Sequence, residues 1–319
     1  MERDRVIEIA GLTKRYDDFI AVDELDLKIP DGQFTIILGP SGSGKTTVLR
    51  MLNRMVTPTS GTVKIGGVDV STEKVEDLRR RMGYVIQNTG LFPNMSVLRN
   101  VGTVPRLLGW ERKKTSVRAE EMLELVGLDP AVYGAKMPSQ LSGGEAQRVG
   151  VARALAADPP ILLMDEPFGA VDPITRERLQ IEMKRLHHQL KKTVVFVTHD
   201  IDEAVLLSDK IALLKGGVLQ QYASPEVLWK QPANQFVSDF FGSDFGLRIM
   251  IRHRLGQLDL LPIAGDSAGL PRLDASATLK EALAELVDKR AHAVVVIRDG
   301  AEAGTVTFET LMCELGREV

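Results

Sequence analysis

The sequence has almost no cysteine and no long apolar run. Its single cysteine, Cys313, excludes a disulfide framework, fits a reducing compartment and is expected to be a small buried apolar residue. No run of about 18 apolar residues occurs, so no transmembrane helix is expected. Residues 1–5 carry charges of both signs with no apolar core after them, which argues against a signal peptide. We therefore expect a cytoplasmic chain, which still allows a peripheral role on a membrane-embedded partner.

The sequence also lacks an excess of charge of either sign. The formal net charge is −3, so nothing in the bulk balance points to nucleic acid as a partner. Hydrophobic residues make up 44% and charged residues 26%, which is ordinary for a soluble globular protein. A length of 319 residues suits one large domain followed by a smaller one.

What the sequence does contain is a glycine-rich loop between a predicted strand, residues 34–38, and a predicted helix. Its pattern, GxxxxGK[ST], lets the backbone curl so that several N–H groups point at one anion, assisted by the helix N-terminus. Lys45 is expected to reach the β- and γ-phosphates of a nucleotide, and the Thr46 hydroxyl to hold Mg²⁺. The predicted phosphate-binding residues are Gly39, Pro40, Ser41, Gly42, Ser43, Gly44, Lys45, Thr46 and Thr47.

Two acids follow a second apolar run. Residues 161–164 are typical of a buried parallel strand, and Asp165 and Glu166 come directly after them. Carboxylates at the carboxyl end of such a strand are costly to bury unless they meet a metal or move a proton. Asp165 is the expected Mg²⁺ partner of Thr46. Glu166 is expected to position the attacking water or to act as general base, the alternative being that the two acids cap a helix.

Other features are weaker when each is taken alone. Ser142–Gly144 precede a helix-forming stretch and offer a second anion-binding geometry, although many loops contain this triplet. His199 ends another predicted buried strand and either contacts a γ-phosphate or lies on the surface. Tyr16 connects two early strands and either packs or stacks on a base ring. Gln87 ends a further predicted strand.

The remaining periodicity predicts a β-layer and a small second module. Alternating residues over 6–9 and 26–29 predict half-buried strands of an antiparallel layer ahead of the nucleotide core. Between residues 243 and 269 no strong period occurs, as in a linker or the start of a domain. A helix, two strands and a closing helix are then predicted over 277–287, 293–297, 304–308 and 309–315.

Taken together and in order, these motifs resemble the nucleotide-binding subunit of the ABC transporter superfamily over about the first 240 residues. The resemblance implies an α/β P-loop NTPase core with an antiparallel β-layer and a helical subdomain. It identifies Gln87 with the Q-loop, residues 141–145 with the signature sequence and His199 with the switch loop. It also identifies residues 170–172 with the D-loop, and it places Tyr16 where this family stacks adenine.

The resemblance also implies a mechanism that uses ATP and Mg²⁺. Two cassettes face head to tail, so ATP on the phosphate loop of one is completed by the signature of the other. Gln87 would touch the metal or the attacking water and sense the membrane subunit, Glu166 would polarise the water, and His199 would hold the γ-phosphate. The residues implied to complete the partner's ATP site are Ser142, Gly143, Gly144, Glu145 and Asp172.

Three stretches, 100–110, 168–176 and 241–248, resemble the importers of quaternary-amine osmoprotectants: glycine betaine, carnitine, choline and proline betaine. This implies an ATP hydrolase that works as a homodimer at the cytoplasmic face of the membrane, with transmembrane permease subunits and, through them, a substrate-binding protein. The alternatives are an importer of polyamines, amino acids or sugars, and a soluble non-transport ABC ATPase. The soluble class usually carries two cassettes or a long coiled coil, and this sequence has neither.

We expect an ABC ATP-binding domain over residues 1–241, a linker over 242–257 and a single CBS-like regulatory module over 258–319. In CBS modules the last strand often ends in a Gly-x-x-Thr-x-x-Asp pattern that binds ribose and phosphate. Here Gly304 and Thr307 match this pattern, but Thr310 stands in place of the acid. That departure weakens any expectation of adenine-nucleotide sensing, and the alternative is a dimerising or regulatory remnant.

Overall fold

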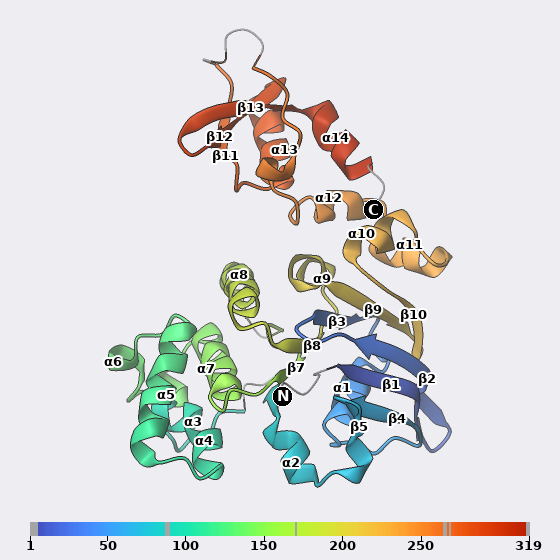
Figure 1. Cartoon of the computed structure of the whole chain (residues 1–319), viewed down its shortest axis with the longest axis vertical. Coiled ribbons are helices and arrows are strands. Elements are labelled where there is room, and N and C mark those ends of the chain that lie inside the picture. The colour runs from blue at the N-terminus through green and yellow to red at the C-terminus, as the bar shows by residue number, and fades with distance from the viewer. Residues whose placement is uncertain (1–5, 87–89, 170, 264–266, 268, 317–319) are drawn as a thin grey trace. The chain divides into compact units, whose positions relative to one another are not determined.

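The computed structural model of the chain describes residues 6–86, 90–169, 171–263, 267 and 269–316. These residues belong to two units, 1–224 and 225–319. The first unit contains two sheets and a group of helices, and the second contains one small sheet with helices (Figure 1).

A six-stranded sheet forms the centre of the first unit. Strands β3, β6, β7, β8 and β9 run parallel, and β10 pairs with β9 in the antiparallel sense. Strands β3, β7 and β8 are buried along their whole length, as their continuous apolar sequences predict. The strand order is β10 (Val218–Ala223), β9 (Lys210–Lys215), β3 (Phe34–Leu38), β8 (Thr193–Val197), β7 (Ile161–Asp165) and β6 (Met82–Val85).

The predicted antiparallel layer is confirmed as a second, four-stranded sheet, in which β2 and β4 flank β1. Its apolar residues share one core with helix α1 (Lys45–Leu52) and with the six-stranded sheet. This core fixes α1 between the two sheets and therefore fixes the direction in which the preceding loop opens. The strand order is β2 (Phe19–Ile29), β1 (Ile7–Tyr16), β4 (Ser60–Ile65) and β5 (Val68–Asp69).

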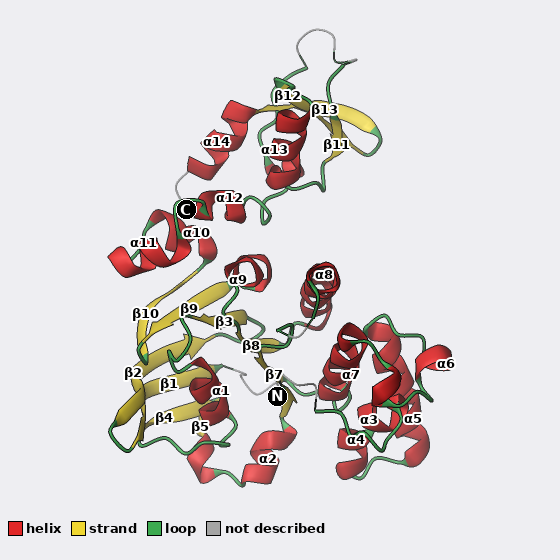
Figure 2. Cartoon of the chain, turned by 180° about the vertical axis from the view of Figure 1, so that it is seen from behind, coloured by secondary structure: helices red, strands yellow, loops and turns green. Residues whose placement is uncertain are grey.

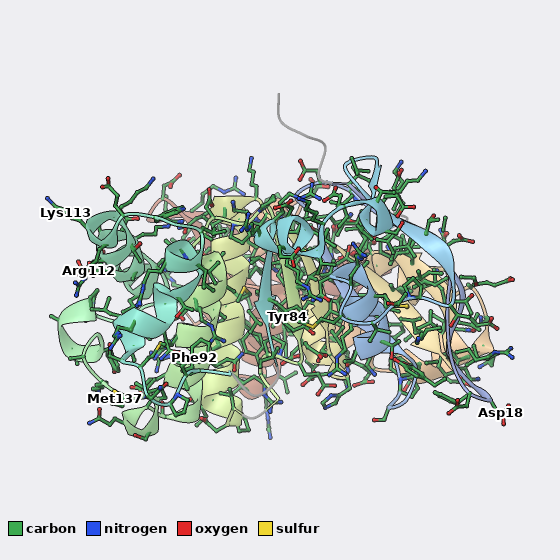
Figure 3. The ribbon with its side chains drawn as sticks, turned by 90° about the horizontal axis from the view of Figure 1, so that it is seen from below. Asp18, Tyr84, Phe92, Arg112, Lys113 and Met137 are labelled. Atoms are coloured by element: carbon green, nitrogen blue, oxygen red, sulfur yellow. The ribbon has the colours of Figure 1, made fainter. Side chains whose placement is uncertain are left out.

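The segment between β6 and β7 forms the expected helical subdomain, which Figure 2 shows as a group beside the sheets. Figure 3 shows Arg112 and Lys113 projecting from this group at the end of the unit opposite Asp18. The helices before and within this region are η1 (Val70–Thr72), α2 (Val75–Arg80), α3 (Val97–Val101), α4 (Thr103–Leu107), α5 (Arg112–Leu125), α6 (Pro130–Tyr133), η2 (Pro138–Gln140) and α7 (Gly143–Leu155). Two further helices precede and follow β8 in the sequence, namely α8 (Pro173–Leu190) and α9 (Ile201–Leu207).

The second unit contains the predicted helix, strand, strand and helix. In its small sheet β12 lies between β11 and β13, parallel to the first and antiparallel to the second. Three helices precede this sheet: α10 (Pro225–Lys230), α11 (Gln235–Phe241) and α12 (Phe245–Ile249). The remaining elements are η3 (Leu255–Gln257), β11 (Arg272–Asp274), α13 (Leu279–Asp288), β12 (Ala293–Arg298), β13 (Ala301–Thr307) and α14 (Phe308–Gly316).

The segment predicted as a linker, residues 242–257, is packed. The rings of Phe241 and Phe245 stack with centroids 4.1 Å apart. Met250 and Leu255 are fully buried in the same core as α13 and β12. The boundary between the two units therefore lies after Ser224, earlier than the predicted position at 241.

Two further expectations concern single features. Cys313 is exposed, so the prediction that it is a buried apolar residue was wrong. It lies on α14, whose other face supplies the buried Leu311 to the core of the second unit. Across the described ranges, none of the helices combines the length and apolar character that crossing a bilayer requires.

Candidate active site

The loop between β3 and α1 has a backbone that only glycine adopts without strain. Gly39, Gly42 and Gly44 have φ angles of 150°, 78° and 92°. A Cβ atom on Gly39 would lie 2.2 Å from the carbonyl oxygen of Leu214, and one on Gly44 would lie 2.2 Å from that of Ala21. Two of the three glycines are thus required by close backbone contacts as well as by their φ angles. The loop is held against both sheets.

The side chain of Lys45 folds back into this loop. Its ammonium group donates hydrogen bonds to the carbonyl oxygens of Gly39, at 2.8 Å, and Pro40, at 2.9 Å. The residue is only 7% exposed. Burial lowers the pKa of Lys45, and the carboxylates of Glu166 and Asp165 oppose this shift. The loop therefore contains a buried cation whose direct hydrogen bonds go to neutral carbonyl groups.

Ser43 contributes a buried hydroxyl group to the same loop. The residue is 2% exposed, and its Oγ atom has no hydrogen-bond partner within the described ranges. A buried polar atom without a partner costs roughly 1–3 kcal/mol. An anion with several oxygen atoms, bound in the loop, would supply the missing partner. Pro40, Ser41 and Gly42 lie exposed at the tip of the loop.

The predicted pair of Thr46 and Asp165 is brought together by the sheet. Asp165 ends β7, and the Thr46 hydroxyl in the first turn of α1 donates a 2.8 Å hydrogen bond to its Oδ1 atom. Asp165 is 7% exposed. Burial raises the pKa of Asp165, and the hydrogen bond from Thr46 is the largest of the effects that oppose it. The pair offers two oxygen ligands of the kind that Mg²⁺ prefers.

Glu166 and His199 also meet at this edge of the sheet. Nδ1 of His199 lies 3.3 Å from Oε1 of Glu166, and His199 is the more exposed of the two side chains. The Glu166 N–H group donates to the carbonyl oxygen of Val197 at 3.0 Å, which extends the pairing of β7 with β8. Glu166 has a φ angle of 43°, a left-handed backbone that costs a non-glycine residue roughly 1–3 kcal/mol. The pairing of β7 thus continues to the Glu166 N–H group, while the backbone of Glu166 departs from the extended form.

The signature segment is held in place by a capping box. Ser142 caps α7: its Oγ accepts from the Glu145 N–H group, and its own N–H group donates to Oε2 of Glu145 at 2.7 Å. The hydroxyl of Tyr133 donates to Oε1 of Glu145 at 2.8 Å. The hydrogen bond from the Ser142 backbone, followed by that from Tyr133, lowers the pKa of Glu145. Sequence reasoning missed Tyr133, because only the fold brings α6 to the start of α7.

The predicted D-loop leads into α8. Asp172 caps this helix, with Oδ1 accepting from the Thr175 N–H group at 3.0 Å. A Cβ atom on Gly144 would lie 2.5 Å from the Cγ2 atom of Thr175, so the first turns of α7 and α8 are in close contact. The structure thus places the signature glycines beside the D-loop of the same chain. Ala170 lies outside the described residues.

Two other predicted residues lie apart from this cluster. Tyr16 ends β1 with 44% of its surface exposed, and the Lys14 ammonium group lies 4.8 Å from its ring centroid. An exposed ring of this kind is available for stacking. Gln87 lies outside the described residues.

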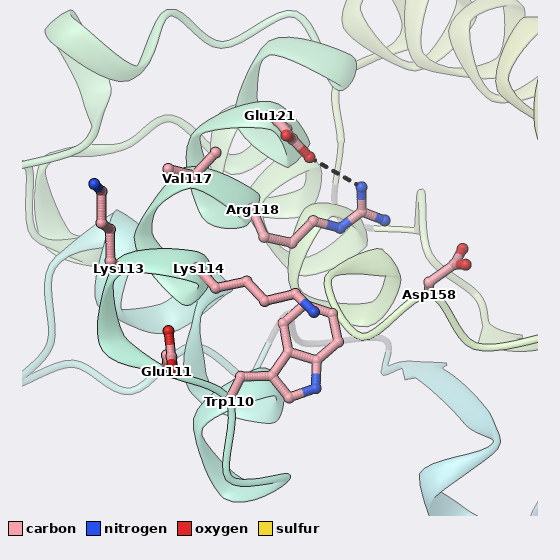
Figure 4. Close-up of a pocket in the computed structure, with 8 residues that line it drawn as sticks. All are labelled: Trp110, Glu111, Lys113, Lys114, Val117, Arg118, Glu121 and Asp158. Atoms are coloured by element: carbon pink, nitrogen blue, oxygen red, sulfur yellow. Dashed lines mark hydrogen bonds and ion pairs between the residues drawn. The ribbon is translucent and has the colours of Figure 1, made fainter.

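A separate hollow of about 560 Å³ lies at the start of α5 (Figure 4). The Lys114 ammonium group lies 4.5 Å from the centroid of the Trp110 ring, and Arg118 donates to Glu121 at 3.1 Å. Of the predicted site residues that the structure describes, none lines this hollow. It is therefore distinct from the nucleotide site.

The comparisons with known proteins agree with the geometry at the sheet edge. A sequence profile of the family described as ABC transporter matches residues 22–169. The chain is 44% identical over 310 residues to the osmoprotectant import ATP-binding protein OsmV of Salmonella typhimurium, with 94% of this chain and 79% of OsmV covered. The chain belongs to the ABC transporter family of ATP-binding proteins. It is thus an ATPase of this family, as the resemblance implied.

Two more similarities extend this assignment. This chain is also 43% identical to the glycine betaine uptake system ATP-binding protein YehX of Escherichia coli, over 97% of this chain and 100% of YehX. Among solved structures, the dimeric bacterial ABC transporter cassette MJ0796 is 35% identical. The two structures superimpose with a TM-score of 0.62, and the superposition covers 68% of this chain and 98% of the MJ0796 cassette. The ABC fold predicted from the motifs is confirmed.

Proposed function

We propose that this chain is the ATP-hydrolysing subunit of an ABC importer for quaternary-amine osmoprotectants. The observation that carries the proposal is the extent of the similarity to YehX, which covers 97% of this chain and so reaches beyond the cassette into the second unit. The names of YehX and OsmV specify glycine betaine and osmoprotectants. By comparison, the spermidine/putrescine import ATP-binding protein PotA of Roseobacter denitrificans matches 78% of this chain.

The residues present fit a nucleotide. In this proposal the phosphates bind the loop's N–H groups, the Lys45 ammonium group and the Ser43 hydroxyl, which has no hydrogen-bond partner in the part of the chain that the structure describes. In this proposal the phosphates replace the carbonyl oxygens of Gly39 and Pro40 as partners of Lys45. The exposed ring of Tyr16 stacks on the adenine.

Thr46 and Asp165 would hold Mg²⁺. Both supply oxygen atoms, and within the described ranges no group of three His, Cys, Asp or Glu side chains is arranged around a metal position. This fits an ion that takes its other ligands from nucleotide phosphates and water, as Mg²⁺ often does. When bound, Mg²⁺ neutralises charge that develops on the phosphates. Gln87 is proposed to contribute at the same position.

The proposed catalytic residues act on the attacking water and the γ-phosphate. Glu166 accepts the proton of the water as general base, from a strained backbone position directly after β7. His199 holds the γ-phosphate, and its 3.3 Å contact with Glu166 keeps the two side chains at one position. Charge stabilisation comes from Lys45 and from the N–H groups of the loop.

The proposal includes partners. Two copies form a homodimer in which the signature residues Ser142–Glu145 and Asp172 of one chain complete the ATP site of the other. The dimer attaches to transmembrane permease subunits at the cytoplasmic face of the membrane, and these receive the amine from a substrate-binding protein. The bound ATP stabilises the closed dimer, and hydrolysis removes the contacts that keep it closed.

The second unit has a proposed regulatory role as a CBS-like module over residues 258–319. Its Gly304 is explained by packing, because a Cβ atom there would lie 2.7 Å from Cβ of Leu260 and 2.8 Å from the carbonyl oxygen of Leu261. Thr307 and Thr310 hydrogen-bond to each other through their hydroxyl groups at 3.0 Å. These contacts account for the partial motif without a nucleotide, so the proposed regulation does not rest on adenine binding.

The proposal is tested by uptake of labelled glycine betaine after a salt upshift. Cells lacking other uptake of this solute would carry the native chain, Lys45→Ala or the control Lys280→Ala, which changes an exposed lysine on α13. We expect uptake to be lost only in Lys45→Ala. We also expect unlabelled choline, but not putrescine, to block uptake by the native chain. Uptake by the native chain that putrescine blocks and choline does not would move the cargo to polyamines. Uptake unaffected by Lys45→Ala would overturn the osmoprotectant assignment.

A further inference from the structure

One side chain bridges the D-loop and the switch loop of the same chain. Arg176 lies at the start of α8, and its Nη2 atom donates a 3.0 Å hydrogen bond to the carbonyl oxygen of Val171. Its Nη1 atom lies 3.6 Å from Oδ2 of Asp200, the residue that follows His199. The Arg176 guanidinium group thus contacts both the segment before α8 and the segment before α9.

A second connection lies one turn further along α8. The side chain of Gln180 donates to Oε1 of Glu203 at 3.1 Å, and the Thr198 hydroxyl donates to Oε2 of the same carboxylate at 2.5 Å. Gln180, Glu203 and Thr198 are 8%, 4% and 2% exposed. This buried chain of hydrogen bonds ties α8 to the residue that precedes His199.

His199 is therefore held from both sides in the sequence. The Asp200 N–H group donates to the Thr198 hydroxyl at 3.0 Å, and Oδ1 of Asp200 accepts from the N–H groups of Asp202 and Glu203 at the start of α9. The Thr198 N–H group donates to the carbonyl oxygen of Ile37 in β3. Of the two connections to α8, the one through Arg176 alone also reaches the D-loop.

The contacts of Arg176 do little for stability. Arg176 and Asp200 are each 29% exposed, and a partly exposed ion pair contributes about 0–1 kcal/mol. The Nε atom of Arg176 is buried and has no hydrogen-bond partner in the described part of the chain, which costs roughly 1–3 kcal/mol. The hydrogen bond to Val171 contributes roughly 1.5–3 kcal/mol and offsets that cost, so the arrangement as a whole is close to neutral as a stabilising device.

We propose that Arg176 is a positioning residue, which couples the placement of the D-loop to the placement of His199. The inference rests on the proposed function, in which Asp172 faces the partner cassette and His199 contacts the γ-phosphate. When a second copy seats against Asp172, the bond from Arg176 to Val171 carries that displacement to Asp200 and so to His199. The switch histidine reaches its working position only in the closed dimer.

The test compares ATP hydrolysis by the purified full-length chain and three variants. Arg176→Met removes both contacts, and Asp200→Asn removes the charge partner while an asparagine can still cap α9. Arg178→Met is the matched control, because this arginine is exposed on the same helix. Arg176→Met and Asp200→Asn are expected to lower kcat about ten- to a hundredfold, as misplacement of a catalytic group does, with ATP half-saturation within twofold of native.

The comparison also includes cooperativity, which a purely structural role would leave unchanged. The Hill coefficient for ATP should fall towards 1 in Arg176→Met, and Arg176→Lys, which keeps the charge, should recover part of kcat. If the native chain hydrolyses ATP and Arg176→Met matches Arg178→Met in kcat and cooperativity, the coupling role is wrong and the proposed function stands. A native chain that does not hydrolyse ATP would overturn both.

Discussion

The hydroxyl group of Thr46 donates a 2.8 Å hydrogen bond to Oδ1 of Asp165, which joins the first turn of α1 to the end of β7. The contact places a carboxylate in a nearly dry position at the edge of the sheet, where burial raises the pKa of Asp165. The fold therefore disfavours the charged form of Asp165. A cation bound beside Asp165 would offset that penalty, so the same burial that destabilises the charged carboxylate favours binding of the cation.

The first prediction concerns stability and pH. Because the folded-state pKa of Asp165 is raised, the unfolded chain releases this proton at a lower pH than the folded chain does. The contribution of Asp165 to stability is thus present at low pH and is lost as the pH rises through its titration range. Asp165→Asn should melt at a higher temperature than the native chain at pH 7 without nucleotide. That difference should vanish towards about pH 4.

Calorimetry at several pH values checks this prediction, with Asp288→Asn as a control that changes an exposed aspartate on α13. A variant that melts below the native chain at pH 7 would show that the carboxylate stabilises the fold. Asp165→Asn should bind ATP less tightly than the native chain in the presence of Mg²⁺, because one of the two proposed oxygen ligands for the ion is altered. Without Mg²⁺ the two chains should bind ATP about equally.

The second prediction concerns Lys45. Its ammonium group is already oriented by the carbonyl oxygens of Gly39 and Pro40, so it needs no large movement to meet a phosphate. A charge-assisted hydrogen bond contributes roughly 1.5–3 kcal/mol. Losing two such bonds in Lys45→Ala should weaken ATP binding by more than about a hundredfold. Titration calorimetry measures the affinity, and equal affinities for Lys45→Ala and Lys280→Ala would contradict the assigned role of the phosphate loop.

The third prediction separates binding from hydrolysis. Glu166→Gln keeps the size of the side chain and its position beside His199, but a glutamine amide cannot accept a proton from water. ATP affinity should stay within about threefold of native, while kcat should fall about 10²- to 10⁴-fold. Glu177→Gln, on an exposed position of α8, is the matched control. Turnover near that of the control would exclude Glu166 as the general base.

The fourth prediction concerns Tyr133, whose hydroxyl supports the signature segment through Glu145. Tyr133→Phe removes a hydrogen bond worth about 1 kcal/mol. It also leaves the capping box of Ser142 less firmly oriented. We expect kcat to fall severalfold with little change in ATP affinity, because ATP is held by the phosphate loop of the other chain. A fall in affinity with unchanged kcat would place Tyr133 outside the signature's function.

The motifs were predictable where a local pattern sets the structure. The phosphate loop lies between a strand and a helix that are its neighbours in sequence, and parallel pairing of β3, β7 and β8 follows from their apolar runs. The positions of Asp165, Glu166 and His199 at one edge could therefore be predicted. No local pattern indicates that Tyr133 meets Glu145 or that Arg176 meets Asp200, because these contacts depend on how helices pack.

The unit boundary could not be predicted for a related reason. Residues 242–257 have no regular apolar period, which is why they were predicted as a linker. Their apolar side chains are buried one at a time by different neighbours: Phe245 stacks on Phe241, and Met250 and Leu255 enter the core around α13. A segment can thus be packed without any periodicity, since a short helix and a turn each contribute single side chains to a core.

This packing leads to the last prediction, which concerns where the chain can be shortened. A chain that ends at Ser224 keeps both sheets and α1, and a solved cassette covers 68% of this chain with 98% of its own length. We expect residues 1–224 to fold and to bind ATP with near-native affinity. A chain that ends at residue 257 would leave Met250 and Leu255 without α13 and β12, which bury them in the full chain.

Exposed apolar side chains of this kind promote association, so the 1–257 chain should aggregate where the 1–224 chain stays monomeric without nucleotide. Light scattering and ATP titration of the two purified fragments measure these outcomes side by side. A soluble 1–257 fragment together with an insoluble 1–224 fragment would assign helices α10 and α11 to the ATP-binding unit, as the boundary at 241 predicts. The reverse result would assign them to the second unit, where Trp229 of α10 packs against the core around α13.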